Sequence, residues 1–137
     1  MSLDQMDHFS IRTVKLEETR EFHENVMDLK VGDHPPLPFP GYWLYLGDDA
    51  VILLVGIDNN SPWRTNDYLG EFAVSQLSGG GAVDRLAFRA SDAENLVKRL
   101  KKHKVPYREH LVQEMNLYQL FVEDPNNITL ELNYWDD

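Results

Sequence analysis

Hydrophobic and polar positions follow the same order twice along the chain. The alternating segment 7–13 lines up with 84–90, and the Asp, the Arg and the apolar positions are in step. After each copy come an amphipathic helical pattern, a short strand pattern and two longer strand patterns joined by an Asp-containing turn. The repeat therefore predicts two modules, each with the order β-α-β-β-β.

Each module contains one predicted helix. In the first, apolar residues recur at helical spacing and predict a helix over about 15–29, with His23 on the solvent side. In the second, an apolar stripe follows Ser91 and Glu94, whose types and spacing indicate a capping box. Basic residues crowd the end of this pattern, where the helix dipole favours positive charge, and Pro106 prevents its continuation.

Period-two alternation predicts a hairpin at the end of each module. The expected strands are 42–46 and 50–56 in the first module, and 117–123 and 128–133 in the second. Between the modules, 58–82 is rich in Asn, Ser and Gly and predicts a polar linker with some local structure. We expect Trp63, Tyr68 and Phe72 to anchor this linker.

The same alternation indicates which side chains share a strand face. His8 in the first strand, Arg85 in its repeat and Glu131 in the last strand lie at polar positions that could face one concave surface. A carboxylate midway along an otherwise apolar strand is costly to bury unless it is paired. Glu131 therefore needs a partner, which could be Arg85, His8 or a cation.

Composition excludes several classes of function. The 137 residues carry 13 Lys and Arg against 23 Asp and Glu, and this net charge of -10 argues against nucleic acid and anionic membranes as partners. The chain has no cysteine, which excludes disulfides, thiolate catalysis and Cys-based metal sites and fits a reducing cytoplasm. No apolar run approaches the roughly 20 residues that span a bilayer. We expect one cytoplasmic domain over 1–137.

Four segments carry a resemblance to a known family: Asp7-His8, 41–48 (GYWLYLGD), 84–89 (DRLAFR) and 124–132 (DPNNITLEL). Together they resemble the vicinal oxygen chelate superfamily, which holds glyoxalase I, bleomycin and fosfomycin resistance proteins and extradiol dioxygenases. The resemblance implies an α+β fold in which the two βαβββ modules form an incomplete, curved mixed barrel. Module one would span about 5–57 and module two about 83–134, and the protein would be a homodimer.

The resemblance also implies one divalent metal ion (zinc, nickel, manganese or iron) on the concave face. His8 matches the first-strand ligand, and Glu131 matches the last-strand carboxylate, which would serve as metal ligand and catalytic base. The sequence departs from this pattern at Arg85, where a histidine is expected, and at Leu53 or, with a one-residue slip, Leu54. Arginine has only N–H donors and cannot coordinate a cation, so we expect a charge-assisted pair between Arg85 and Glu131.

Aromatic and amide residues complete the expected site for a small molecule. Trp43 and Tyr45 share one strand face, and Tyr118 or Gln119 lies at the matching strand of the second module. With Arg85, these residues are assigned to binding an anionic or aromatic small molecule, without an organic cofactor. The predicted function is binding of that molecule in the cavity between the modules, with a degenerate metal site.

Two alternatives stay open on the same residues. With a working metal site the protein would be a lyase, an isomerase or a ring-cleaving dioxygenase. With Arg85 in the place of the metal it would be a metal-free sequestering protein without turnover. Metal content discriminates between the two. A third interpretation is a purely structural dimer with a vestigial pocket, which would show no response to ligands.

Overall fold

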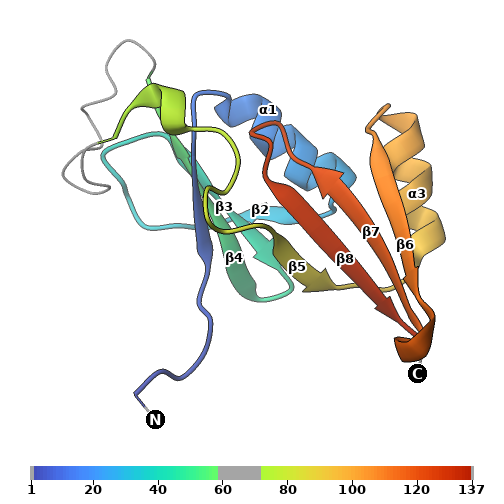
Figure 1. Cartoon of the computed structure of the whole chain (residues 1–137). Coiled ribbons are helices and arrows are strands. Elements are labelled where there is room, and N and C mark those ends of the chain that lie inside the picture. Colours follow the sequence, from blue (N-terminus) through green and yellow to red (C-terminus); the bar gives the residue numbers. More distant parts are fainter. Residues whose placement is uncertain (1, 59–71, 137) are drawn as a thin grey trace. The chain divides into compact units, whose positions relative to one another are not determined.

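Each module of the chain forms a four-stranded sheet whose first and last strands pair in parallel. The computed structural model describes residues 2–58 and 72–136 (Figure 1). It divides into one unit of Met1–Glu24 and Asp28–Leu77 and a second unit of Asn25–Met27 and Ser78–Asp137. The order β-α-β-β-β occurs in both units, which confirms the predicted α+β fold of two βαβββ modules.

The first unit contains the sheet order β1-β4-β3-β2. Its elements are β1 (Phe9–Thr13), α1 (Leu16–Glu21), the π-helical turn η1 (Phe22–Val26), β2 (Lys30–Gly32), β3 (Gly41–Leu46), β4 (Asp49–Gly56) and the short 3₁₀ turn η3 (Val74–Gln76). The last two residues of η1 belong to the second unit. The β3–β4 hairpin matches its prediction to within one residue at each end. Ile11, Leu44, Ile52 and Leu54 are buried in this unit and form part of its core.

His23 corrects one prediction for the first unit. It was expected on the solvent side of the helix, but its side chain is fully buried, with its ring 5.2 Å from that of Phe22. His23 lies in η1, where the backbone winds with i→i+5 hydrogen bonds. The wider turn changes which side chains point inward, so a pattern read at 3.6 residues per turn misplaces this residue.

The second unit contains the sheet order β5-β8-β7-β6. Its elements are β5 (Leu86–Arg89), α3 (Ala93–Lys102), β6 (Tyr107–Val112), the 3₁₀ turn η4 (Gln113–Met115), β7 (Leu117–Glu123) and β8 (Thr129–Trp135). Helix α3 buries Leu96 and Leu100, and Leu120 and Leu130 of the sheet are buried in the same unit. No helix in the described ranges is both long and apolar enough to cross a membrane.

The start of α3 differs from the expected capping box. The N-cap is Asp92 rather than Ser91, and its Oδ1 accepts a hydrogen bond of 3.3 Å from the backbone N–H of Asn95. Asp92 has a left-handed backbone, with φ of 60°. The chain therefore turns into the helix one residue later than the sequence pattern indicates.

Part of the linker packs on the first unit. Phe72 packs against the buried cluster of Phe39, Val55 and Ile57, and the guanidinium carbon of Arg12 lies 4.7 Å from the centre of its ring. The anchoring expected of Phe72 is therefore confirmed. Trp63 and Tyr68 lie outside the described residues.

Candidate functional site

One face of the second sheet carries polar side chains in register across its strands. Glu131 of β8 pairs with Ala87 of β5 and with Phe121 of β7, which in turn pairs with Arg108 of β6. The next row along the strands consists of Arg89, Asn133, Gln119 and His110. Paired residues point to the same side of a sheet, so the two rows form one surface. We call this surface, together with Arg85, the polar sheet face.

Glu131 is the buried charge of the polar sheet face. Its side chain is 8% exposed, and its Oε1 lies 2.7 Å from Nε of Arg85. No hydrogen bond aligned on Oε1 is found in the described residues, so this contact is an ion pair without a directed N–H. Asn133 donates from Nδ2 to Oε2 of the same carboxylate over 2.8 Å. Arg85 is half-exposed and also donates to Asp84 over 2.9 Å.

A chain of side-chain amides leads across the sheet to this carboxylate. Gln119 donates from Nε2 to Oδ1 of Asn133 over 3.0 Å, and its Oε1 lies 3.0 Å from Nδ1 of His110. Because Asn133 accepts through Oδ1, its Nδ2 is directed to Glu131. The orientation of the two amides therefore directs an N–H of Asn133 to the Glu131 carboxylate. At the other end of the chain, the Gln119 oxygen accepts a hydrogen bond from Nδ1 of His110.

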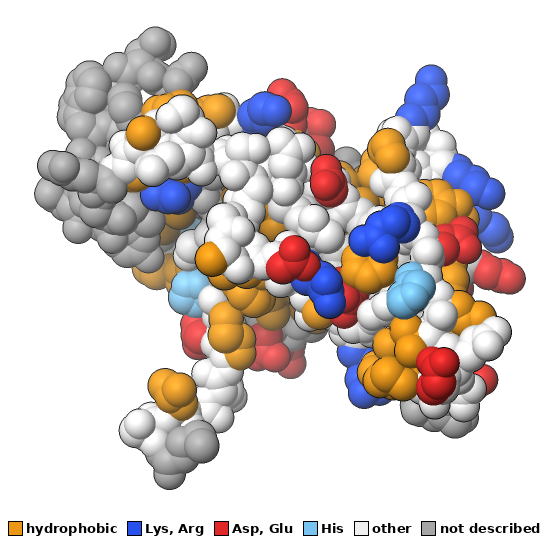
Figure 2. All heavy atoms as spheres, in the orientation of Figure 1, with side chains coloured by type: hydrophobic (Ala, Val, Ile, Leu, Met, Phe, Trp, Pro, Cys, Tyr) orange, Lys and Arg blue, Asp and Glu red, His pale blue; other side chains and the backbone are white. Residues whose placement is uncertain are grey.

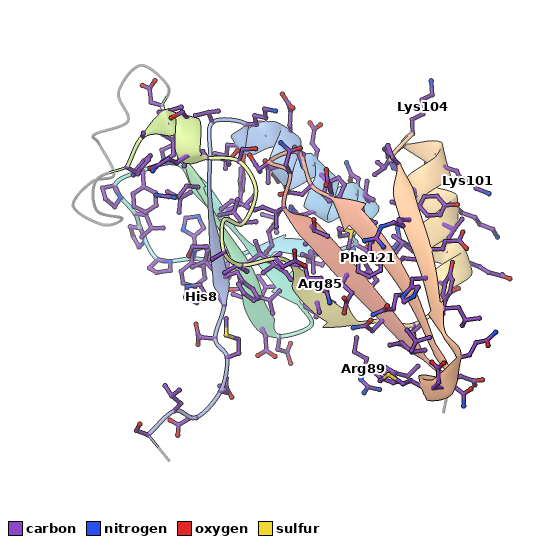
Figure 3. All side chains as sticks on the ribbon, in the orientation of Figure 1. His8, Arg85, Arg89, Lys101, Lys104 and Phe121 are labelled. Atoms are coloured by element: carbon purple, nitrogen blue, oxygen red, sulfur yellow. The ribbon has the colours of Figure 1, made fainter. Side chains whose placement is uncertain are left out.

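Three arginines of the polar sheet face lie over aromatic rings. The guanidinium carbon of Arg108 is 4.1 Å from the centre of the Phe121 ring, and that of Arg85 is 5.8 Å from it. Arg89 lies over Trp135 at 5.6 Å. Figure 3 shows Arg85 and Phe121 near each other and Arg89 farther along the sheet. Such stacking is attractive and limits the motion of a long side chain.

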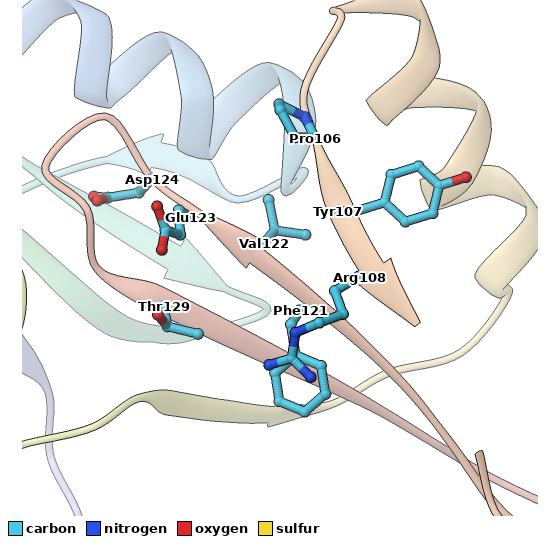
Figure 4. A pocket seen from close by; sticks show the side chains of 8 residues that line it. All are labelled: Pro106, Tyr107, Arg108, Phe121, Val122, Glu123, Asp124 and Thr129. Atoms are coloured by element: carbon cyan, nitrogen blue, oxygen red, sulfur yellow. The ribbon is translucent and has the colours of Figure 1, made fainter. Parts of the chain in front are cut away.

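A pocket of about 470 Å³ opens beside Arg108. Figure 4 shows the Arg108 guanidinium over the Phe121 ring, with Glu123 and Thr129 farther along the strands. In the space-filling view, basic, acidic and hydrophobic side chains meet over β7 and β8 (Figure 2). The pocket volume lies in the range of small-molecule sites, roughly 300–1,000 Å³.

Two predicted residues of the first unit, Trp43 and Tyr45, lie on one face of its sheet. Trp43 pairs with Leu53, which pairs with Ser10, whereas Leu54 pairs with Ile11 on the opposite face. Of the two leucines considered for the missing ligand, Leu53 therefore shares the face of the polar first-strand positions. His8 precedes β1, and its Nδ1 lies 2.5 Å from Oδ2 of Asp7.

Trp43 and Tyr45 contact the loop that follows β2. The Trp43 ring lies 6.1 Å from the ring of His34, and the Tyr45 hydroxyl donates to the backbone carbonyl of Asp33 over 2.6 Å. Tyr45 also packs over Gly32, where an added Cβ would come within 2.6 Å of its ring. These contacts hold both aromatic side chains against their own unit.

Tyr118 and Gln119 lie on opposite faces of β7. Gln119 belongs to the polar sheet face, whereas the Tyr118 ring lies 6.0 Å from the ring of Tyr134. Burial raises the pKa of Tyr118, and burial raises the pKa of Tyr134 to about 12. Of the two alternatives left open by the sequence, Gln119 is the one on the same face as Glu131.

Sequence reasoning did not select Arg108, Phe121 or Asn133 for the site. Asn133 was detectable, because its position two residues after Glu131 gives it the same face. Arg108 and Phe121 become neighbours only through the pairing of β6 with β7. That register is not visible in the alternation of a single strand.

The donor set in the described residues does not fit a divalent metal. A catalytic site takes about three protein ligands with lone pairs to share, but both Glu131 oxygens are occupied by Arg85 and Asn133. Leucine stands at the other expected position, and the described ranges contain no group of three His, Asp or Glu placed to hold an ion. Instead, Arg85 forms an ion pair with the carboxylate and Asn133 donates a hydrogen bond to it, both from the same unit.

Comparison with known proteins gives a family match over most of the chain. The model of the Glyoxalase/Bleomycin resistance protein/Dioxygenase superfamily matches residues 5–132. No curated protein matches the chain in sequence.

Three solved structures illustrate the range of similar folds. Lactoylglutathione lyase from Agrobacterium tumefaciens is 16% identical, covering 98% of this chain and 96% of that one, with a TM-score of 0.64. The fosfomycin resistance protein FosX from Listeria monocytogenes is 14% identical, with coverages of 98% and 95% and a TM-score of 0.66. TnmS3, an antibiotic binding protein from Streptomyces sp. CB03234, is 16% identical, with coverages of 99% and 99% and a TM-score of 0.65. Similarity at these identities establishes the shared fold, and function depends on the residues of the site.

Proposed function

The chain belongs to the glyoxalase/bleomycin resistance protein/dioxygenase superfamily, and on that premise we propose that it binds a small organic molecule without a metal ion. The proposed binding surface is the part of the polar sheet face formed by Arg85, Arg108, Gln119, Glu131 and Asn133, together with the pocket beside Arg108, which Arg89 does not line. The observation that carries this proposal is the ion pair of 2.7 Å between Arg85 and the buried Glu131. It supplies the positive charge that a metal ion would otherwise bring to the carboxylate.

The energetics of Glu131 support this proposal. A buried carboxylate that loses its partner is destabilising by roughly 3–5 kcal/mol. A metal ion at Glu131 would have to displace the Arg85 contact and compete with the Asn133 hydrogen bond. The described residues contain no group of three His, Asp or Glu side chains placed to hold an ion, so metal binding there would not recover that cost and the internal pair is favoured.

This binding surface also has the chemistry of a ligand site. It combines stacked guanidinium groups, side-chain amides held in fixed orientations and the nearby pocket of about 470 Å³. Sites of this kind orient a ligand with a few polar groups and take affinity from apolar walls. Binding without turnover is the activity that this arrangement supports best. The antibiotic binding protein TnmS3 offers a precedent for binding on a similar fold.

Metal titration tests the proposal directly. Purified protein is stripped with EDTA and analysed by mass spectrometry for metals, and thermal shifts are recorded with Zn²⁺, Ni²⁺, Mn²⁺, Co²⁺ and, anaerobically, Fe²⁺. We expect substoichiometric metal and the same small shifts in wild type and Glu131→Gln. Near-stoichiometric metal, with a stabilising shift that Glu131→Gln removes, would overturn the metal-free assignment.

A further inference from the structure

We propose that the pocket beside Arg108 selects organic monoanions that have a flat apolar body and a hydrogen-bond donor. This inference rests on the proposed function and names the ligand class of that binding surface. It assigns the anion to Arg108 and the discrimination against a second negative charge to Glu123. Both residues line the same pocket (Figure 4).

Arg108 is a positioned cation with free donors. Its guanidinium lies 4.1 Å from the centre of the Phe121 ring, and it makes no ion pair with any residue in the described ranges. Stacking uses one face of the guanidinium and leaves the N–H groups at its edge available. A carboxylate in that plane can accept two parallel hydrogen bonds from the guanidinium. Such charge-assisted, bidentate pairs are stronger than hydrogen bonds between neutral groups.

Arg85 and Arg89 do not offer the same combination. The charge of Arg85 is shared between Glu131 and Asp84, at 2.7 and 2.9 Å. Arg89 stacks on Trp135 at 5.6 Å but does not line the pocket. Arg108 is therefore the arginine that a ligand in this pocket would meet, and Arg89 provides a matched control.

The walls of the pocket favour a flat, apolar body. Phe121 and Val122 line it from β7, and Pro106 and Tyr107 line it from the start of β6. Phe121 is buried beneath the Arg108 guanidinium, whereas Pro106 is exposed and Tyr107 is partly exposed, so the apolar surface open to a ligand at Arg108 comes mainly from Pro106 and Tyr107. A flat aromatic ligand gains from packing against such a surface.

Carboxylates in the pocket set the limit on ligand charge. The Asp124 carboxylate already accepts hydrogen bonds from the backbone N–H groups of Asn126 and Ile128, at 2.8 and 3.0 Å. Glu123 is exposed and makes no ion pair within the described part of the chain. It can accept a hydrogen bond from a ligand hydroxyl or amino group, as can the Thr129 hydroxyl. A second anionic group at this end would be repelled by Glu123.

A series of related probes tests this charge preference by isothermal titration calorimetry. The probes are 4-hydroxybenzoate, its neutral analogue 4-hydroxybenzamide and the dianion 5-hydroxyisophthalate. We expect 4-hydroxybenzoate to bind at least fivefold more tightly than either of the others. Arg108→Gln should weaken its binding by about 10- to 100-fold, because a charge-assisted pair is lost. The same substitution should leave the affinity for 4-hydroxybenzamide almost unchanged.

Two further variants complete the experiment. Glu123→Gln should strengthen binding of 5-hydroxyisophthalate several-fold, and Arg89→Gln should change no affinity by more than twofold. Equal affinity for the acid and the amide, equal losses in Arg108→Gln and Arg89→Gln, or no binding of any probe would overturn the proposed ligand class. Circular dichroism of each variant checks that it is folded.

Repeating the titrations in EDTA separates this inference from the proposed function. Unchanged affinities would support metal-free binding of the anion. Binding that EDTA abolishes and Zn²⁺ restores would overturn the metal-free function. The relative affinities of the three probes would still test the ligand class.

Discussion

The Nε of Arg85 lies 2.7 Å from Oε1 of Glu131, so the buried carboxylate of β8 has its counter-charge within the same unit. The pair predicted from the sequence is therefore present. Asn133 occupies the second oxygen and is itself oriented by Gln119. The carboxylate that the family resemblance assigned to a metal is here contacted by Arg85 and Asn133, and this determines how substitutions around it should behave.

Replacing Arg85 with alanine should lower the free energy of unfolding by about 2–3 kcal/mol. Breaking a buried pair costs roughly 3–5 kcal/mol, and we reduce that figure because half of the Arg85 side chain is exposed, so water can solvate part of the lost charge. Urea denaturation at neutral pH measures the change. Arg89→Ala, which removes a stacked arginine without a carboxylate partner, should cost about 1 kcal/mol or less.

The double variant Arg85→Ala/Glu131→Gln is the decisive control for this pair. Glutamine keeps an oxygen that can accept from Asn133 and removes the charge that Arg85 neutralised. It should recover much of the stability lost in Arg85→Ala. Equal losses in Arg85→Ala and Arg89→Ala, with no recovery in the double variant, would contradict a stabilising pair.

Asp92→Ala should destabilise the second unit by about 1 kcal/mol, because it removes the acceptor for the backbone N–H of Asn95 at the start of α3. Ser91→Ala should have almost no effect, since Ser91 is not the N-cap. Asp92→Asn keeps a side-chain oxygen and tolerates the left-handed backbone, so it should retain most of the stability. Thermal unfolding of the three variants tests this order, and a larger loss in Ser91→Ala would restore the capping box inferred from the sequence.

Alkaline titration should reveal the late ionisation of Tyr134. Burial raises the pKa of Tyr134 to about 12, whereas a tyrosine in an unfolded chain has a pKa of about 10. The neutral form is therefore favoured by folding, and its stabilisation is complete below about pH 10 and disappears as the pH rises through 12. Absorbance at 295 nm should show a step near pH 12 in wild type that Tyr134→Phe lacks. Ionisation of all tyrosines near pH 10 in the folded protein would rule out this environment.

Gly41→Ala should destabilise the first unit by on the order of 2 kcal/mol. An added Cβ would lie 2.3 Å from the backbone carbonyl oxygen of Leu54, and a backbone atom cannot move aside cheaply. Gly47→Asn is the control, because Gly47 has φ of +63° and nothing within 4 Å of an added Cβ. Asparagine tolerates this backbone, so the control should cost only a few tenths of a kcal/mol. Chemical denaturation compares the two, and equal stabilities would refute the close approach.

The fold was predictable from the sequence because its signals are local and occur twice. Alternation predicted both hairpins, and the repeat predicted both βαβββ modules. Where the prediction was wrong, the backbone departs from regular geometry. The π-helical turn buries His23, and the left-handed Asp92 delays the start of α3.

The candidate site was predictable only in part, because it depends on pairing between strands. Arg85 and Glu131 could be matched through the family pattern and the unfavourable burial of a lone carboxylate. Arg108 reaches Phe121 through the register of β6 on β7, and the order of the amides in Gln119 and Asn133 depends on hydrogen bonds between strands. Neither relationship produces a periodic pattern of residues in the sequence.

The parallel pairing of first and last strands also constrains how the chain folds. The β3–β4 hairpin has a short turn, so it can form quickly from neighbouring residues. Strand β1 must instead wait for β4, because Phe9 pairs with Ile52 and Thr13 with Gly56. During synthesis from the N-terminus, β1 therefore leaves the ribosome well before its partner exists. It remains an unpaired strand until nearly the whole module has emerged. During this interval a chaperone that covers β1 would protect the chain most from aggregation.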